Sequence, residues 1–177
     1  CEKLGPKCES ELFNYLKTLV LRYRHSKAIF AWQVENEPFF PFGVCPKIKE
    51  DFVKREIALV KSLDQRPVIF GDSGEFSFWM RAASLSDIVA VTLHRKVYFK
   101  EIKQYLTYPF PPIFYWRKAK LVEKFFGKKV IVGELQAEPW CKNLIYHCSL
   151  EEQEKTMNEE QLKKNIDFVK NTGLDTV

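Results

Sequence analysis

Two glutamates in this sequence directly follow apolar, strand-like segments. Glu37 follows IFAWQVEN (residues 29–36), and Glu134 follows KVIVG (residues 129–133). Two carboxyl groups that flank one bond can hydrolyse a glycoside, because one protonates the leaving oxygen while the other attacks the sugar or activates water. Partial burial and the like charge of the partner would raise the pKa of the acid. This chemistry requires a fold that brings Glu37 and Glu134 together.

The neighbours of these glutamates are suited to binding. Asn36 can donate an amide hydrogen bond to a bound molecule. Pro38 lacks an N–H and favours an extended backbone at Glu37, which predicts a Glu37 side chain aimed into a cleft. Glu35 is expected to be solvated. Other polar or aromatic residues follow the later predicted strands, namely Asp72, Ser73, Glu75, His94, Arg95, Tyr98, Gln136, Glu138 and Trp140.

Short apolar segments alternate with segments of helical periodicity along the chain. We expect strands at residues 28–34, 67–70, 88–93 and 129–132, with a fifth beginning at 174. We expect helices at residues 10–23, 47–63, 76–83, 114–126 and 158–171. Gly127 and Gly173 are predicted helix stops, and Asn158 is a predicted N-cap with Gln161 in the capping-box position. Residues 94–113 and 135–157 are expected to be loops.

This alternation predicts an α/β fold with a parallel sheet, because the strands are apolar on both faces and separated by helices. An open doubly wound sheet and a (β/α)8 TIM barrel are the two candidates. A full barrel needs ~250 residues, so a chain of 177 residues would form an incomplete barrel with only the central and C-terminal βα units. Strands three apart in a barrel face each other across its mouth, which would place Glu37 opposite Glu134.

Composition narrows the classes of partner. The net charge of +5 comes from 28 basic and 23 acidic residues. These charges are spread over the predicted helices, whereas nucleic-acid binding favours a single basic stripe, so no nucleic-acid partner is expected. No apolar run reaches the ~18 residues of a membrane helix. The chain begins with Cys1 and no signal-peptide pattern, so we expect a piece of a longer protein, and localisation and oligomeric state stay open.

Five cysteines are present, an odd number that fits neither a complete disulfide framework nor a regular metal site. Cys141 and Cys148 lie in one predicted loop and could pair in an exported protein. His147 beside Cys148 raises the question of a metal, but the chain has no second short Cys/His pair. No metal is therefore expected.

Two motifs carry a resemblance to a known group of enzymes. WQVENEP (residues 32–38) resembles the fourth-strand motif of the clan A glycoside hydrolases, which include the cellulases and mannanases of family 5 and the β-galactosidases of family 42. VIVGEL (residues 130–135) resembles the seventh-strand motif of that clan. Two βα units lie between them, as in the clan. The resemblance spans nearly all of residues 1–177, from the third helix to the start of the eighth strand, and is greatest to cellulase-like glycosylhydrolases.

The resemblance implies a role for each matching residue in retaining hydrolysis of a β-linked oligo- or polysaccharide. Glu37 would be the acid/base and Glu134 the nucleophile, while Asn36 would bind the sugar 2-hydroxyl. No metal or organic cofactor is implied. His94 or Tyr98 would orient the carboxylates or the sugar, although HRKVY departs from the clan's usual His-Tyr spacing. Trp140 is a candidate stacking platform for a sugar, or else a loop aromatic packed on the rim. Glu138 is the rival to Glu134.

Some expected parts of the clan pattern are absent. An Arg and often a His from the second and third strands, and an aromatic from the eighth, do not lie within these 177 residues. We therefore expect the chain alone to be inactive. One alternative is a carbohydrate-binding barrel without catalytic activity. Another is a nucleotide-binding doubly wound domain, but its best phosphate-loop candidate, GDSG (residues 71–74), lacks both the GxGxxG spacing and a P-loop lysine.

Overall fold

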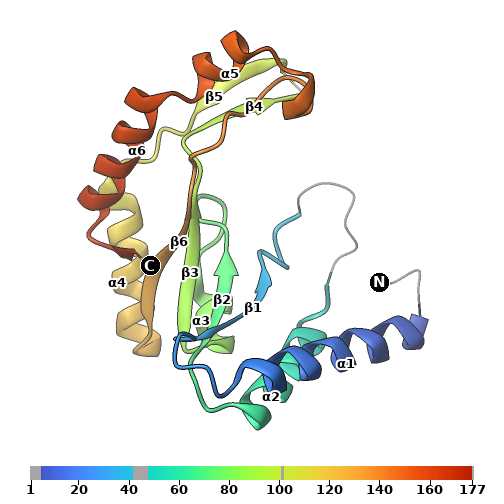
Figure 1. Ribbon diagram of the computed structural model, residues 1–177. Helices are drawn as coiled ribbons and strands as arrows, with labels where there is room; N and C mark the ends of the chain where they lie inside the picture. The colour runs from blue at the N-terminus through green and yellow to red at the C-terminus, as the bar shows by residue number, and fades with distance from the viewer. Residues whose placement is uncertain (1–4, 42–47, 101, 177) are drawn as a thin grey trace.

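The computed structural model describes residues 5–41, 48–100 and 102–176 and shows an α/β arrangement (Figure 1). Five parallel strands form one sheet in the order β1-β2-β3-β6-β7, and β4 and β5 form a separate antiparallel hairpin. The strands are β1 (Trp32–Asn36), β2 (Val68–Asp72), β3 (Ile88–Leu93), β4 (Lys96–Phe99), β5 (Gln104–Thr107), β6 (Lys129–Leu135) and β7 (Asp175–Thr176). The helices are α1 (Gly5–Tyr23), α2 (Glu50–Leu63), α3 (Met80–Leu85), α4 (Pro112–Phe126), α5 (Leu150–Thr156) and α6 (Glu159–Thr172), with a 3-10 turn η1 (Ile145–His147).

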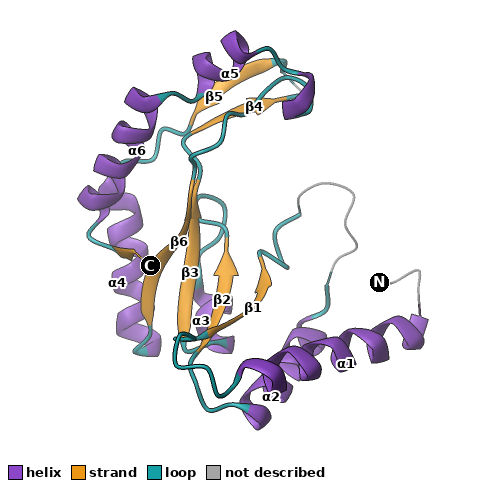
Figure 2. Cartoon of the chain, in the orientation of Figure 1, coloured by secondary structure: helices purple, strands orange, loops and turns teal. Residues whose placement is uncertain are grey.

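The main hydrophobic core lies between the sheet and the helices. Alternate residues of β2, β3 and β6, such as Phe70, Val89 and Val130, pack against side chains of α2, α3, α4 and α6. The intervening residues, Ile69 and Ala90 among them, form a smaller cluster on the other face, and its described members include no helix residue. Figure 2 shows α4 and α6 beside β6 and α1 and α2 beyond the β1 end of the sheet. The parallel sheet predicted from the sequence is confirmed.

The predicted strand at 88–93 is confirmed, whereas the others differ at their ends. The first strand is shifted, because β1 begins at Trp32 instead of residue 28. Its neighbour supplies the reason: Trp32 pairs with Val68, the first residue of β2, so the preceding residues have no strand beside them. Asp72 and Glu134, which were expected just after their strands, lie inside β2 and β6.

The helices are predicted well where their ends carry a signal. Asn158 caps α6 by accepting a hydrogen bond from the Gln161 backbone N–H at 2.8 Å. Gly127 and Gly173 end α4 and α6 with φ of 63° and 67°, a conformation that glycine adopts without strain. Helix α3 starts at Met80 instead of residue 76, because Trp79 has φ of 64° and interrupts the helical backbone. Helix α1 begins earlier than expected, and the predicted start of α2 at residue 47 lies outside the described residues.

Both long predicted loops contain regular structure. Residues 94–113 include the β4–β5 hairpin, whose strands are only four residues long, too short for a clear alternating pattern. Residues 135–157 include η1 and α5. Ser149 caps α5 by accepting a hydrogen bond from the Glu152 N–H at 3.2 Å, although serine is a common N-cap residue and no helix was predicted there. Among the described residues, no helix has the length and apolar character needed to cross a bilayer.

Candidate active site

Glu37 lies directly beyond β1, in a strained backbone conformation. Its φ is 47°, so the extended conformation predicted from Pro38 is wrong. Two features hold the left-handed backbone. The Glu37 N–H donates to the Gly71 carbonyl of β2 at 3.0 Å, and the register of β1 against β2 shifts between Gln33 and Asn36. Strain of this kind in a residue other than glycine persists only where surrounding contacts enforce it, which is common at functional sites.

The Glu37 carboxyl group is half-buried and hydrogen-bonded. Its Oε1 accepts a hydrogen bond from the Thr92 hydroxyl at 2.8 Å. Burial is the main cause that raises the pKa of Glu37, and the negative charges of Glu134 and Asp72 add to it. The Thr92 hydrogen bond and the charge of His94 oppose the rise. The net upward shift favours a carboxyl group that keeps its proton at a higher pH than a solvated glutamate.

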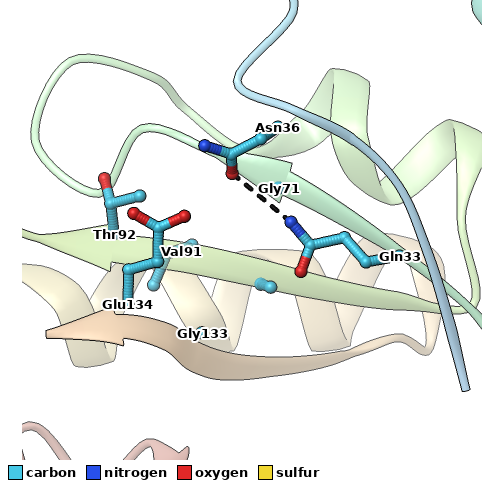
Figure 3. Close-up of a pocket in the computed structure, with 8 residues that line it drawn as sticks. Gln33, Asn36, Gly71, Val91, Thr92, Gly133 and Glu134 are labelled. Atoms are coloured by element: carbon cyan, nitrogen blue, oxygen red, sulfur yellow. Dashed lines mark hydrogen bonds between the residues drawn. The ribbon is translucent and has the colours of Figure 1, made fainter.

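Glu134 is exposed on β6, beside the strand that carries Thr92. In the parallel pairing of β3 and β6, Thr92 is the register partner of Glu134, next to a register shift that follows Val91. Figure 3 shows the Glu134 carboxylate and the Asn36 amide directed into the same small pocket. The structure therefore brings Glu37, Asn36 and Glu134 to the carboxyl ends of the strands, β1 and β6 being three places apart in the sheet.

Two glycines permit this close approach. A Cβ on Gly71 would lie 2.7 Å from Asn36 Oδ1, and a Cβ on Gly133 would lie 2.8 Å from the Ala90 Cβ. Asn36 Oδ1 also accepts a hydrogen bond from the Gln33 amide at 3.4 Å (Figure 3). This hydrogen bond orients the Asn36 side chain, and the amide nitrogen of Asn36 takes no part in it.

His94, Trp140 and Glu138 form a second group at this end of the sheet. The His94 and Trp140 rings lie with centroids 5.5 Å apart. Glu138 Oε1 accepts a hydrogen bond from the Trp140 indole at 2.8 Å and lies 3.7 Å from His94 Nδ1. Glu138, the rival to Glu134, is therefore engaged with Trp140 and His94. The His94 ring lies within electrostatic range of the Glu37 carboxyl group, and its charge lowers the pKa of Glu37.

Tyr98 lies in the hairpin instead of directly after a sheet strand. It belongs to β4, and its ring packs edge-on against Tyr105 of β5 at 5.0 Å. Tyr108, which was not predicted as a site residue, lies closer to Glu37. Burial, followed by the charges of Glu75 and Glu37, raises the pKa of Tyr108 to about 12. No sequence signal marked Tyr108, because it lies in a proline-rich segment that was expected to be a loop.

Asp72, the last residue of β2, and Glu75, in the loop that follows, are both buried. Glu75 is buried and accepts a hydrogen bond from the Tyr115 hydroxyl at 2.9 Å, and burial raises its pKa to about 7. Asp72 is buried and accepts hydrogen bonds from Ser77 at 2.6 Å and from the Ser73 N–H at 2.8 Å. These groups were expected to converge with the site, but their contacts mainly fix the loop after β2.

Gln136 also makes contacts that hold neighbouring segments together. It is buried, and its Oε1 accepts hydrogen bonds from the backbone N–H groups of Arg95 at 2.7 Å and Lys96 at 2.8 Å. Its amide donates to the Lys96 carbonyl at 2.7 Å, and its own carbonyl accepts from Asn165 of α6 at 2.9 Å. Gln136 therefore ties the start of the hairpin to β6 and α6.

An aromatic cleft of about 370 Å³ opens beside the loop that follows Glu37. Phe40 and Phe76, which line it, stack on each other with ring centroids 5.7 Å apart, and Phe78 is 80% exposed. The remaining lining residues are Phe39, Pro41, Asp72, Ser77, Trp79, Met80 and Arg81. Exposed rings of this kind present flat apolar faces next to polar groups, a surface suited to the C–H faces of sugars.

Two cysteines of the described residues, Cys141 and Cys148, lie close together. Both are free thiols, and the Cys148 thiol lies within hydrogen-bonding range of Cys141. Burial and this contact raise the pKa of Cys141 to about 12. Within residues 5–41, 48–100 and 102–176, no group of three His, Cys, Asp or Glu side chains could hold a metal ion. Cys1 and Cys45 lie outside these ranges.

The curated proteins to which the chain is similar include mannan endo-1,4-β-mannosidases. The chain is 31% identical over 77 residues to mannan endo-1,4-β-mannosidase A of Emericella nidulans, a match that covers 43% of this chain and 20% of that protein. It is 36% identical over 67 residues to a probable mannan endo-1,4-β-mannosidase A of Aspergillus niger, covering 37% and 17%. The resemblance to glycoside hydrolases is confirmed. No protein-family model matches the chain. The chain spans only a fifth or less of the length of these two mannosidases.

Solved structures of glycoside hydrolases share the fold. A β-galacturonidase of Eisenbergiella tayi matches with a TM-score of 0.58 and 16% identity, over 93% of this chain and 27% of that protein. A fungal β-1,4-galactanase matches with a TM-score of 0.55 and 10% identity, over 95% and 57%. A β-glucanase of Saccharophagus degradans matches with a TM-score of 0.52 and 14% identity, over 96% and 50%. These TM-scores support a shared α/β fold, whereas identities of 10–16% carry no information about the substrate.

Proposed function

We propose that the chain is part of the (β/α)8 barrel of a retaining glycoside hydrolase that cleaves a β-linked polysaccharide. Strands β1, β2, β3, β6 and β7 would then be the fourth to eighth strands of the barrel. Their parallel order and the one-sided helical covering support this reading. The mannan endo-1,4-β-mannosidases among the relatives make a 1,4-β-mannan the first substrate to test.

The main support for the proposal is that Glu37 and Glu134 differ in burial. Glu37 is half-buried with a raised pKa, whereas Glu134 is exposed at the same end of the sheet. A retaining glycosidase needs this inequality, because the acid must hold a proton while the nucleophile is ionised. In the first step Glu37 protonates the leaving oxygen as Glu134 attacks the anomeric carbon. In the second step Glu37 takes a proton from water, which then displaces Glu134 from the sugar.

The surrounding residues would bind and orient the sugar. Asn36 would donate its amide hydrogen bond to the 2-hydroxyl, a bond that strengthens at the transition state. Trp140, whose indole N–H donates to Glu138, would present its ring to a sugar face. The His94 ring packs beside Trp140, and its charge acts on Glu37. The aromatic cleft around Phe76 and Phe78 offers a place for a further sugar unit.

Hydrolysis of mannohexaose by variants of the full-length protein tests the proposal. Glu37→Gln and Glu134→Gln are each expected to lower kcat by roughly 10³-fold or more, since each removes a group that acts in the transition state. Glu11→Gln, a change at an exposed position of α1, is the matched control and is expected to leave kcat unchanged. Turnover by either site variant at the control rate would overturn the proposal. Binding of mannohexaose without hydrolysis by the unmodified protein would support a binding barrel instead.

A further inference from the structure

Thr92 makes two hydrogen bonds that together orient its hydroxyl group. Thr92 Oγ1 accepts a hydrogen bond from the Gly74 N–H at 3.3 Å and donates one to Glu37 Oε1 at 2.8 Å. A hydroxyl group has a single proton. Because the Gly74 N–H occupies an acceptor position on the oxygen, the proton of Thr92 is free to point toward Glu37. Thr92 is 2% exposed, so water does not readily replace either partner.

Gly74 can reach Thr92 only because it lacks a side chain. A Cβ at Gly74 would lie 1.8 Å from the Thr92 carbonyl oxygen, so the loop after β2 touches the backbone of β3 at this point. Lys118 of α4 holds the loop from the other side, donating from Nζ to the Gly74 carbonyl at 2.7 Å. The Lys118 ammonium lies 4.0 Å from the centre of the Trp79 ring and is buried. Helix α4, the loop and β3 thus form one continuous support for the Thr92 hydroxyl.

We propose that Thr92 is a positioning residue that assigns the acid proton of Glu37 to one oxygen. This inference rests on the proposed role of Glu37 as the acid/base. Because the Thr92 hydroxyl donates to Oε1, that oxygen acts as the acceptor, and the proton of the neutral carboxyl group resides on Oε2. An acid with its proton on a fixed oxygen is preorganised for transfer to the leaving group. Resemblance to the clan motifs assigned no role to Thr92, Gly74 or Lys118.

Several charged groups face Glu37 and must be held constant in a test. His94, beyond β3, lowers the pKa of Glu37, whereas Glu134 on β6 and Asp72 on β2 raise it. The phenol of Tyr108 also lies in the field of Glu37. Substitution of Thr92 leaves all four groups in place. The hydrogen bond from Thr92 favours the ionised form of Glu37, so its removal must move the titration of Glu37 to higher pH.

Two substitutions separate the hydroxyl group from the shape of Thr92. Thr92→Val keeps the volume and removes the hydroxyl, whereas Thr92→Ser keeps the hydroxyl. Thr18→Val on α1 is the control, because it too removes a threonine hydroxyl, in this case one that donates to the Asn14 carbonyl at 2.8 Å, and Thr18 is not among the groups that act on the pKa of Glu37. The titration of Glu37 would be followed through its carboxyl ¹³C chemical shift, and the pH profile of kcat/KM on mannohexaose would be measured in parallel.

We expect Thr92→Val to move the Glu37 titration and the basic limb of kcat/KM to higher pH together and to lower kcat roughly tenfold with little change in KM. Thr92→Ser should restore both properties, and Thr18→Val should change neither. An unchanged Glu37 titration in folded Thr92→Val would overturn the inference. If the valine variant does not fold, Thr92→Cys, a weaker donor, must give an intermediate shift or the inference fails. The proposed function fails separately, if Glu37→Gln retains full turnover.

Discussion

Thr92 and Glu134 are register partners on neighbouring parallel strands, and the hydroxyl of Thr92 donates to the carboxyl group of Glu37 at 2.8 Å. One residue of β3 thus lies between the two glutamates that the proposed chemistry requires. The pKa of Glu37 responds to this arrangement, because burial and the charge of Glu134 raise it while the hydroxyl and His94 lower it. Glu37 and Glu134 are therefore coupled through charge as well as through position.

Replacement of Glu134 should change the titration of Glu37. Because the negative charge of Glu134 raises the pKa of Glu37, Glu134→Gln is expected to shift the Glu37 titration to lower pH. The carboxyl ¹³C chemical shift of Glu37 as a function of pH measures this directly. Glu138→Gln is the matched control, since Glu138 follows the same strand but is absent from the groups that act on Glu37. An equal shift in both variants would contradict the assigned arrangement.

Asn36 should contribute mainly to the transition state. Asn36→Ala removes the amide proposed to bind the 2-hydroxyl, and we expect kcat/KM on mannohexaose to fall roughly 100-fold, mostly through kcat. Gln33→Ala removes the hydrogen bond that orients Asn36 and should give a loss of only about threefold, in line with a neutral, partly solvated bond. Steady-state kinetics of both variants distinguish the two effects. A larger loss in Gln33→Ala than in Asn36→Ala would assign the binding role to Gln33.

Replacement of Gln136 should lower the free energy of unfolding. Gln136→Leu would leave the backbone groups of Arg95 and Lys96 without their buried partner, and unpaired buried groups destabilise by ~1–3 kcal/mol each. We expect the free energy of unfolding to fall by roughly 3 kcal/mol in urea titrations. Gln104→Leu, at an exposed position of β5, should change it by less than about 0.5 kcal/mol. Equal stability of the two variants would show that the hairpin is anchored elsewhere.

Glu56 should make the protein less stable as the pH rises. It is 4% exposed on α2, and burial, followed by the charge of Glu35, raises its pKa from 4.5 to about 8. The folded state therefore keeps a proton that the unfolded state loses above 4.5, so stability falls between about pH 4.5 and 8. Glu56→Gln should remove this dependence and gain roughly 2–4 kcal/mol over the parent at the upper end of the range.

Urea titrations at several pH values measure the Glu56 effect. Glu11→Gln on the exposed face of α1 serves as the control, and its stability should follow that of the parent at every pH. A parallel pH dependence in Glu56→Gln and in the parent would contradict the assignment. Glu35, expected from the sequence to be solvated, takes part in this effect, and its φ of 61° marks the same strained segment as Glu37.

The sequence was informative where one strong local signal determined the structure. The β-branched run at 88–93, the cap at Asn158 and the stops at Gly127 and Gly173 all appear as predicted. The left-handed backbone at Glu37 was not predictable, because it depends on a hydrogen bond to Gly71 of another strand. The β4–β5 hairpin was missed for a similar reason, since it is held by Gln136, which lies far away in the sequence.

Some residues of the candidate site were predictable from the sequence, and others were found only in the structure. Glu37, Asn36 and Glu134 were selected because two strand-end motifs name them, and the structure brings them to one end of the sheet. Thr92 and Tyr108 were missed, because their importance arises from contacts with Glu37 across the fold. Asp72, Glu75 and Gln136 were grouped with the site on position alone, and the structure shows that their hydrogen bonds go to Ser77, Tyr115 and Lys96.

The most direct test of the central claim is to trap the covalent intermediate. A 2-deoxy-2-fluoro-β-mannosyl fluoride slows both steps of a retaining reaction, so the sugar should remain attached to the nucleophile. Peptide mass spectrometry of the full-length protein after this treatment should place a single fluorosugar on Glu134, and Glu134→Gln should remain unlabelled. A label on Glu138, or steady hydrolysis of mannohexaose with no labelled peptide, would contradict the assignment of Glu134 as the nucleophile.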